Sequence, residues 1–297
     1  MLAAACWGSG TVLSRVAVDD VAPLVLLPLQ LATSLAFLIL AMRRRGEPVA
    51  FLTRPRALGA LGILNPGLAY ALGLLGLAQL SASVAVVIWA TEPALVALLA
   101  LPIHGERLRP SVVALSAVAI GGIVILAGDP AAGGTAVGIA FVAAAVLGCA
   151  IYTVATRRWL PDAPATLGVV VAQQAAALAF ALVVVGLAAV LAPGFLAAPG
   201  TGTGVGSAAP TATLVGSVVA SGLVYYGLAY WLYLDGLRRV PASLAATAFY
   251  LIPVFGSRRP MPSVSGSSRG PGPGRRSCSS PSRPSVGSHD PAARTTA

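Results

Sequence analysis

Nine apolar segments, each close to the length of a membrane-crossing helix, dominate the sequence. Only 9% of its 297 residues are charged, against about 25% in an ordinary soluble domain. Because lipid offers the backbone no hydrogen-bond partner, apolar segments of this length are expected to be helical. We therefore expect an all-α, polytopic membrane helix bundle with spans near residues 2–18, 23–42, 57–78, 83–103, 112–128, 135–155, 167–192, 214–235 and 242–256.

The arginines indicate how these spans are oriented. Every second loop carries arginine, whereas the loops between them carry acidic residues or no charge. Since Lys and Arg near span ends stay on the cytoplasmic side, this alternation predicts a multi-pass protein of the cell's inner membrane with a cytoplasmic N-terminus. The arginines that define the alternation are Arg43, Arg44, Arg45, Arg54, Arg56, Arg107, Arg109, Arg157, Arg158, Arg238 and Arg239.

The net charge of +10 does not indicate a nucleic-acid partner. The chain has 19 arginines and no lysine, and seven of those arginines lie in the segment 257–297. The charge is therefore not spread over a basic face of the apolar part, and we expect the lipid bilayer, not nucleic acid, to surround the chain.

An internal repeat divides the apolar part of the chain. The segments 67–70 and 227–230 are both Gly-Leu-Ala-Tyr, and the second and seventh predicted spans align with Gln30 on Gln173. The repeat unit contains five spans, so the second copy enters the membrane from the opposite side. Inverted repeats of this kind are typical of alternating-access carriers, and they also occur in channels and in some membrane enzymes.

Four short motifs resemble the drug/metabolite transporter superfamily, and within it the ten-span proteins built from two EamA domains. The motifs are Trp7-Gly8-Ser9, Pro93, Gly105-Glu106-Arg107-Leu108 and Gly121-Gly122. The resemblance implies a first EamA repeat over 1–128, with five helices, and a second over 129–256, with four. It also implies secondary transport of a small metabolite, amino acid or drug. The chain departs from the family pattern at Gln30, where many relatives carry Arg, and in lacking a tenth span.

The segment after Gly256 does not continue the repeat. Most of 257–297 is Ser, Pro, Gly or Arg, and such a composition cannot bury enough apolar surface to become ordered. The repeat predicts a second Gly-Glu-Arg-Leu near 265–268, where the sequence is Ser-Gly-Ser-Ser. We expect a disordered tail created by a frameshift near Gly256, which would leave a truncated transporter. A natural disordered cytoplasmic tail is the alternative.

Glu92 is the strongest candidate for chemistry. A carboxylate within a span costs about 2.5–3.5 kcal/mol on insertion scales, and such groups usually face a cavity or a partner. Pro93 follows it and should open the helix there. We expect Glu92 to bind substrate and to carry the proton of a proton-coupled carrier. The alternative is a structural role, in which Glu92 pairs with Arg15 or caps a broken helix.

Glutamines and aromatic residues complete the predicted substrate site. The repeat-related Gln30 and Gln173 could donate to a substrate from symmetric positions, or could form hydrogen bonds between helices. Aromatic residues within spans could line a pocket or could anchor the spans at the membrane interfaces. The aromatic candidates for the pocket are Trp7, Tyr70, Trp89, Tyr230 and Tyr250.

The sequence predicts no enzyme, no cofactor and no metal site. Neither His104 nor His289 has a metal-type neighbour, and the three cysteines, Cys6, Cys149 and Cys278, have no metal or redox spacing. An alternative function is a membrane-embedded enzyme acting on lipid or isoprenoid substrates, although the clustered Asp, His or Lys of such enzymes is missing. A non-functional fragment is another alternative, and a homodimer is left open.

Overall fold

The computed structural model describes residues 1–18, 20–47, 56–77, 79–80, 82–105, 110–111, 113–114, 117–118, 121, 135–163, 165–196, 211–252 and 255. Contacts separate the unit Met1–Arg258 from the remainder of the chain, Arg259–Ala297. Every described residue belongs to that unit. The predicted tail, and most of the predicted span over 112–128, lie outside the described residues.

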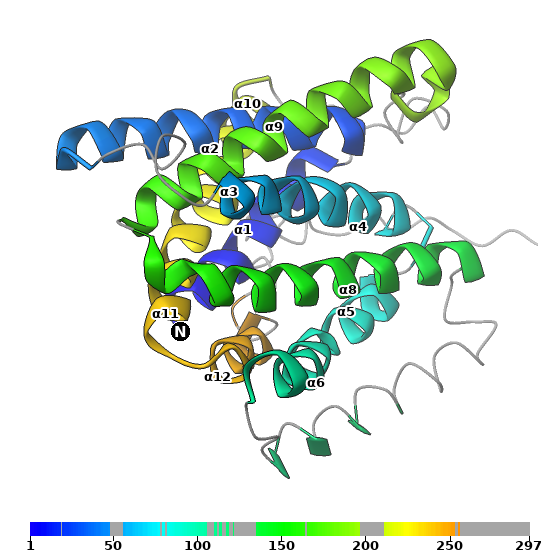
Figure 1. Ribbon diagram of the computed structural model, residues 1–297. Coiled ribbons are helices and arrows are strands. Elements are labelled where there is room, and N and C mark those ends of the chain that lie inside the picture. Colours follow the sequence, from blue (N-terminus) through cyan, green and yellow to red (C-terminus); the bar gives the residue numbers. More distant parts are fainter. Residues whose placement is uncertain are drawn as a thin grey trace, which may run out of the picture. The chain divides into compact units, whose positions relative to one another are not determined.

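Helices make up all the elements with defined bounds in the described part of the chain (Figure 1). The α-helices are α1 (Leu2–Val18), α2 (Pro23–Arg45), α3 (Arg56–Gly62), α4 (Ala69–Leu77), α5 (Ala82–Trp89), α6 (Glu92–His104), α8 (Ala136–Trp159), α9 (Thr166–Leu191), α10 (Thr211–Ser221), α11 (Ala229–Arg239) and α12 (Ala242–Ala246). Two segments are π-helical, η2 (Ile63–Leu68) and η7 (Gly222–Leu228). Three are 3₁₀-helical, η4 (Leu160–Asp162), η5 (Pro193–Leu196) and η8 (Thr247–Leu251).

The helices confirm the predicted polytopic membrane bundle. Within the described residues, five helical stretches are long and apolar enough to cross a bilayer. These are Pro23–Arg45, Ala57–Gly76, Ala136–Asp162, Thr166–Leu191 and Thr211–Arg239, and shorter apolar helices cover Leu2–Ser14, Glu92–His104 and Ala242–Leu251.

Two of the spans are interrupted. In the third span, Asn65 has an extended backbone (φ −148°, ψ 122°), because the residue before a proline is pushed out of the helical region and Pro66 has no N–H to donate. The fourth span consists of α5 and α6, with a break at Ala90 and Thr91. Pro93 lies in the first turn of α6, so the expectation that the helix opens there is confirmed.

Each half of the chain packs its second helix against the third span of the other half. Helix α2 contacts α10 and η7, while α9 contacts α3 and η2. Gly62 lies directly against the main-chain carbonyl of Gln173, and Gly222 lies directly against that of Gln30. The internal repeat aligns Gly62 with Gly222 and Gln173 with Gln30, so the two contacts are equivalent.

A second pair of contacts repeats in the same way. A Cβ atom at Gly67 would lie 3.1 Å from Cδ1 of Phe180, and one at Gly227 would lie 3.1 Å from Cδ1 of Phe37. Both glycines therefore allow an aromatic ring of the other half's second helix to approach the backbone closely. The equivalent contacts support the internal repeat that the sequence predicts.

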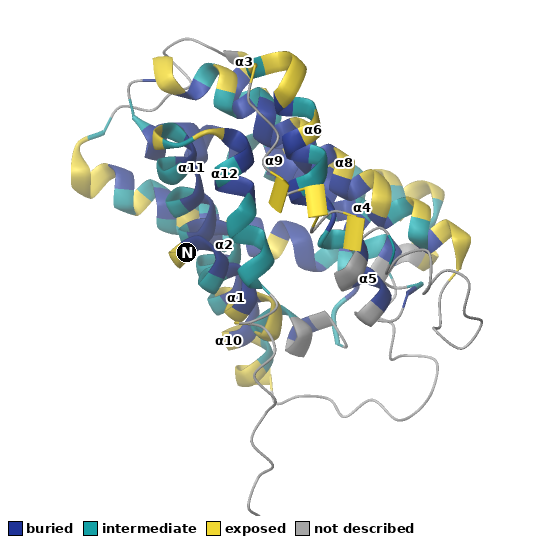
Figure 2. Ribbon diagram, turned by 90° about the horizontal axis from the view of Figure 1, so that it is seen from below, coloured by how far each residue is buried: buried dark blue, intermediate teal, exposed yellow. Residues whose placement is uncertain are grey.

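The core of the described bundle lies where these helices meet. Helices α2 and α9 run side by side, and α4 lies along α8 (Figure 1). Buried residues follow the inner faces of the helices, whereas exposed residues lie on outer faces and at helix ends (Figure 2). Several exposed residues are large and apolar, such as Leu182, Leu187 and Val190 of α9, as expected for a surface that faces lipid.

Candidate functional site

Nine aromatic side chains form a connected group, which we call the aromatic cluster. It draws on seven helices, which range along the chain from α1 to η8. Its members are Trp7 of α1, Tyr70 of α4, Trp89 of α5, Tyr152 of α8, Tyr225 and Tyr226 of η7, Tyr230 and Tyr233 of α11, and Phe249 of η8.

Trp7, Tyr70 and Tyr230 make most of the ring contacts within the cluster. The ring of Tyr70 lies with its centroid 5.6 Å from that of Tyr225 and 5.4 Å from that of Tyr226. Trp7 makes edge contacts with Tyr230 at 5.6 Å and with Tyr233 at 5.2 Å. These separations lie within the range of about 4.5–7 Å in which aromatic pairs attract each other.

The indole of Trp7 is buried in this cluster with its N–H group unpaired. Only 5% of Trp7 is exposed, and its Nε1 has no hydrogen-bond acceptor among the described residues. An unpaired buried donor costs about 1–3 kcal/mol, so this N–H is available to a polar group of a ligand.

Glu92 begins α6 directly after the break in the fourth span. It is 8% exposed, and within the described ranges its carboxylate makes no hydrogen bond or ion pair. The carboxylate lies within electrostatic range of the hydroxyl groups of Tyr225 and Tyr233 and of the Cys149 thiol. Glu92 is therefore a buried titratable group that interacts electrostatically with two tyrosines of the aromatic cluster. The side chain of Arg15, its possible partner, is outside the described residues.

The two glutamines join helices. Gln30 Nε2 donates to Ser221 Oγ at 2.7 Å and to Ser14 Oγ at 3.0 Å. Gln173 accepts a hydrogen bond from the Tyr152 hydroxyl at 2.7 Å and donates to the Leu58 carbonyl at 2.9 Å. Both amides are thus engaged in bonds between helices, which is one of the two roles that the sequence left open.

The remaining candidates divide between the cluster and its edge. Trp7, Tyr70, Trp89 and Tyr230 all belong to the aromatic cluster, and the Tyr230 hydroxyl also donates to Asn65 Oδ1 at 2.7 Å. Tyr250 is half-buried in η8, next to the cluster member Phe249. The structure therefore brings four predicted residues together with Glu92 nearby.

Sequence reasoning missed five members of the cluster. Tyr226, Tyr230 and Tyr233 are spaced by four and three residues, which places them on one face of a helix. That spacing is a signal that could have identified Tyr226 and Tyr233 from the known candidate Tyr230. Phe249 directly precedes the predicted Tyr250, whereas no helical spacing links Tyr152 to a predicted candidate.

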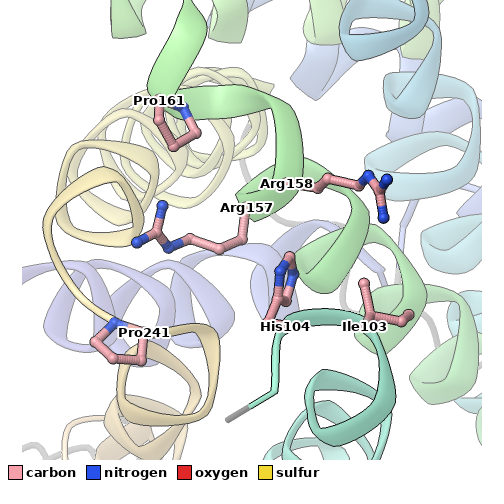
Figure 3. Close-up of a pocket in the computed structure, with 6 residues that line it drawn as sticks. All are labelled: Ile103, His104, Arg157, Arg158, Pro161 and Pro241. Carbon is pink, nitrogen blue, oxygen red and sulfur yellow. The ribbon is translucent and has the colours of Figure 1, made fainter.

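Arginine-bearing helix ends meet at one end of the described bundle. A pocket of about 630 Å³ is lined there by Ile103 and His104 of α6, Arg157 and Arg158 of α8, Pro161 of η4, and Pro241 (Figure 3). Arg238 donates to the Ala163 carbonyl at 2.9 Å, which ties the end of α11 to the segment that follows α8. The ends of α6, α8 and α11, each of which precedes a loop predicted to be cytoplasmic, thus adjoin one another.

Asp235 forms a surface ion pair with Arg239. Its carboxylate lies 3.0 Å from the Arg239 guanidinium, one helical turn away, and both side chains are largely exposed. Such an exposed pair contributes little to stability.

One comparison matches the first part of the chain to a known family, and another matches most of the chain to a solved structure. Residues 1–128 match the model of the EamA-like transporter family. The comparison with curated proteins gave no match. A solved crystal structure is similar in fold, with a TM-score of 0.66 at 24% sequence identity, over 86% of this chain and 83% of that chain.

The likeness in fold extends beyond the family match. Since residues 1–128 are less than half of the chain, an overlap of 86% includes much of the second half. The match of residues 1–128 to the EamA-like transporter family and the apolar helices of the described residues together support a multi-pass membrane protein.

Proposed function

We propose that this chain is a secondary transporter that moves a small metabolite, amino acid or drug across the inner membrane by alternating access. The two repeats, over 1–128 and 129–256, would rock against each other about the site between them. In this proposal the N-terminus and the arginine-bearing helix ends are cytoplasmic. The chain then performs transport and not enzymatic chemistry.

The observation that carries the proposal is the unpaired Trp7 N–H within an aromatic cluster built from both halves. A site that both halves supply can be exposed to either side when one half moves against the other. Aromatic faces bind apolar and aromatic solutes, and a single N–H donor can orient one polar group of the solute.

In this proposal, Glu92 couples the movement of the solute to the movement of a proton. A buried carboxylate without a fixed partner can bind a proton on one side of the membrane and release it on the other when its surroundings change. Its position at the start of α6, next to a helix break, lets its surroundings change without unfolding a continuous helix. We propose Trp7, Tyr70, Trp89, Tyr230 and Glu92 as the substrate site, with Gln30, Gln173 and Tyr250 supporting it from its edges.

The experiment is uptake of labelled apolar and aromatic solutes by protein reconstituted in vesicles. We expect saturable uptake that Trp7→Phe weakens about tenfold, since the ring remains but its N–H is lost. Trp159→Phe is the matched control, because Trp159 lies at the end of α8 outside the aromatic cluster. Equal uptake by the two variants would rule out the assigned role of Trp7, and empty-vesicle rates for every solute would contradict the transporter proposal.

A further inference from the structure

The pocket lined by Arg157 and Arg158 is separate from the aromatic cluster and has no role in the proposed transport step. We propose that it binds the headgroup of an anionic phospholipid that carries two phosphate groups. The proposal depends on the pocket alone and is independent of the proposed transport activity.

The charges of the pocket favour an anion. In the described part of the chain, neither Arg157 nor Arg158 lies within ion-pair distance of a carboxylate, whereas Arg239 is paired with Asp235. Arg157 is half-buried and Arg158 is exposed. Arginine is suited to phosphate because its planar guanidinium can donate two parallel hydrogen bonds to phosphate oxygens.

The directions of the side chains favour two phosphate groups over one. Arg157 extends to one side of His104, between Pro161 and Pro241, whereas Arg158 extends to the other side, above Ile103 in the view (Figure 3). The two guanidinium groups therefore do not converge on a single phosphate. His104 is held between them, with Nε2 3.0 Å from the Val154 carbonyl. A headgroup with two linked phosphates could reach both arginines across the imidazole.

The surroundings of the pocket favour a lipid over a soluble anion. The pocket lies at the ends of α6 and α8, where apolar helix gives way to charged residues, which is the depth of lipid headgroups. Leu147 and Ile151 precede Arg158 on the same face of α8 and are 44% and 43% exposed. An acyl chain could lie along this apolar face while the headgroup contacts Arg158. Basic pockets between membrane helices are known to bind lipids of this class.

The test measures lipid binding to the purified full chain in detergent, by native mass spectrometry and by thermal shift. The probes are cardiolipin, phosphatidylglycerol, phosphatidylcholine and inorganic pyrophosphate. We expect cardiolipin to bind about tenfold or more tightly than phosphatidylglycerol, and Arg157→Gln or Arg158→Gln to remove most of that difference. Arg43→Gln is the matched control, because it removes the same charge at the exposed end of α2, outside the pocket.

Three results would overturn the proposal. Equal affinity for cardiolipin and phosphatidylglycerol would exclude recognition of two phosphates. If Arg43→Gln lost as much cardiolipin affinity as the pocket variants, the preference for cardiolipin would be explained by net charge alone and not by the pocket. If pyrophosphate displaced cardiolipin at a matched phosphate concentration, the pocket would be a site for a soluble anion and not for a lipid.

Lysine variants keep the proposal testable if a glutamine variant does not fold. Arg157→Lys and Arg158→Lys retain the charge and should still bind cardiolipin several-fold less tightly, because ammonium lacks the paired donors. Unchanged affinity in both lysine variants would equally contradict the proposal.

Discussion

At the scale of single residues, Gln173 has more partners than its position in an apolar helix suggests. Its amide accepts from Tyr152 and donates to the Leu58 carbonyl, and thereby joins α9 to α8 and α3. We expect Gln173→Leu to destabilise the protein by about 1–3 kcal/mol, because two buried hydrogen bonds between helices are lost. The measurement is the thermal midpoint in detergent. Gln79→Leu, which loses bonds in a more exposed setting, should change it by much less.

The residue scale also shows why sequence alone could not settle the roles of the glutamines. A buried amide can serve a substrate or a neighbouring helix, and the choice depends on which groups the fold places around it. Ser221 and Ser14 bond to Gln30 from two other helices, which are far apart in the sequence. No local sequence pattern predicts that these serines are its partners. The residues Trp7, Tyr70, Trp89 and Tyr230 were predictable as candidates, but their meeting in one cluster depends on the rotation of four helices.

At the scale of elements, the glycines at the starts of the irregular segments allow the halves to interlock. Gly222 precedes the other residues of η7 and lies against α2, where a Cβ atom would come 2.6 Å from the Gln30 carbonyl oxygen and would also overlap Thr33 Oγ1. We expect Gly222→Ala to cost about 1–3 kcal/mol or more by overpacking, and to lower the thermal midpoint and the yield of folded protein.

The control for this prediction is Gly216→Ala. Gly216 lies in α10, in the same span, and a Cβ atom there would meet nothing within 4 Å. Alanine favours helix over glycine, so this variant should be neutral or slightly stabilised. If the two alanine variants had equal midpoints, the close packing of η7 on α2 would be wrong.

The sequence predicted the positions of the spans well, but it did not predict the irregular segments within them. Apolar length was enough to locate the spans, since hydrophobicity and backbone hydrogen bonding in lipid leave little choice. The break before Glu92 followed from Pro93, but the extended residue at Asn65 and the π-helical segments were not expected. A π-helical turn depends on how the chain packs against another helix, and the hydropathy of a segment does not predict that packing.

At the scale of the whole molecule, the repeat implies a definite topology. The ends of α6, α8 and α11 adjoin at one end of the described bundle, and the inverted repeat requires the same alternation of charge throughout. In a variant without native cysteines, we expect a reagent outside intact cells to label a cysteine placed at Thr203 but not one placed at Gly46. Labelling at Gly46 with protection at Thr203 would reverse the topology and contradict the inverted arrangement.

The central claim is that the chain is a transporter in which Glu92 carries the coupling proton. The most direct measurement compares two assays of the same vesicles, uptake driven by a pH gradient and exchange of solute without a gradient. We expect Glu92→Gln to abolish gradient-driven uptake while exchange continues, because the amide keeps the shape of the side chain but cannot release a proton. Glu47→Gln, which changes a carboxylate just beyond the end of α2, should retain both activities. Gradient-driven uptake that persists unchanged in Glu92→Gln would contradict the account.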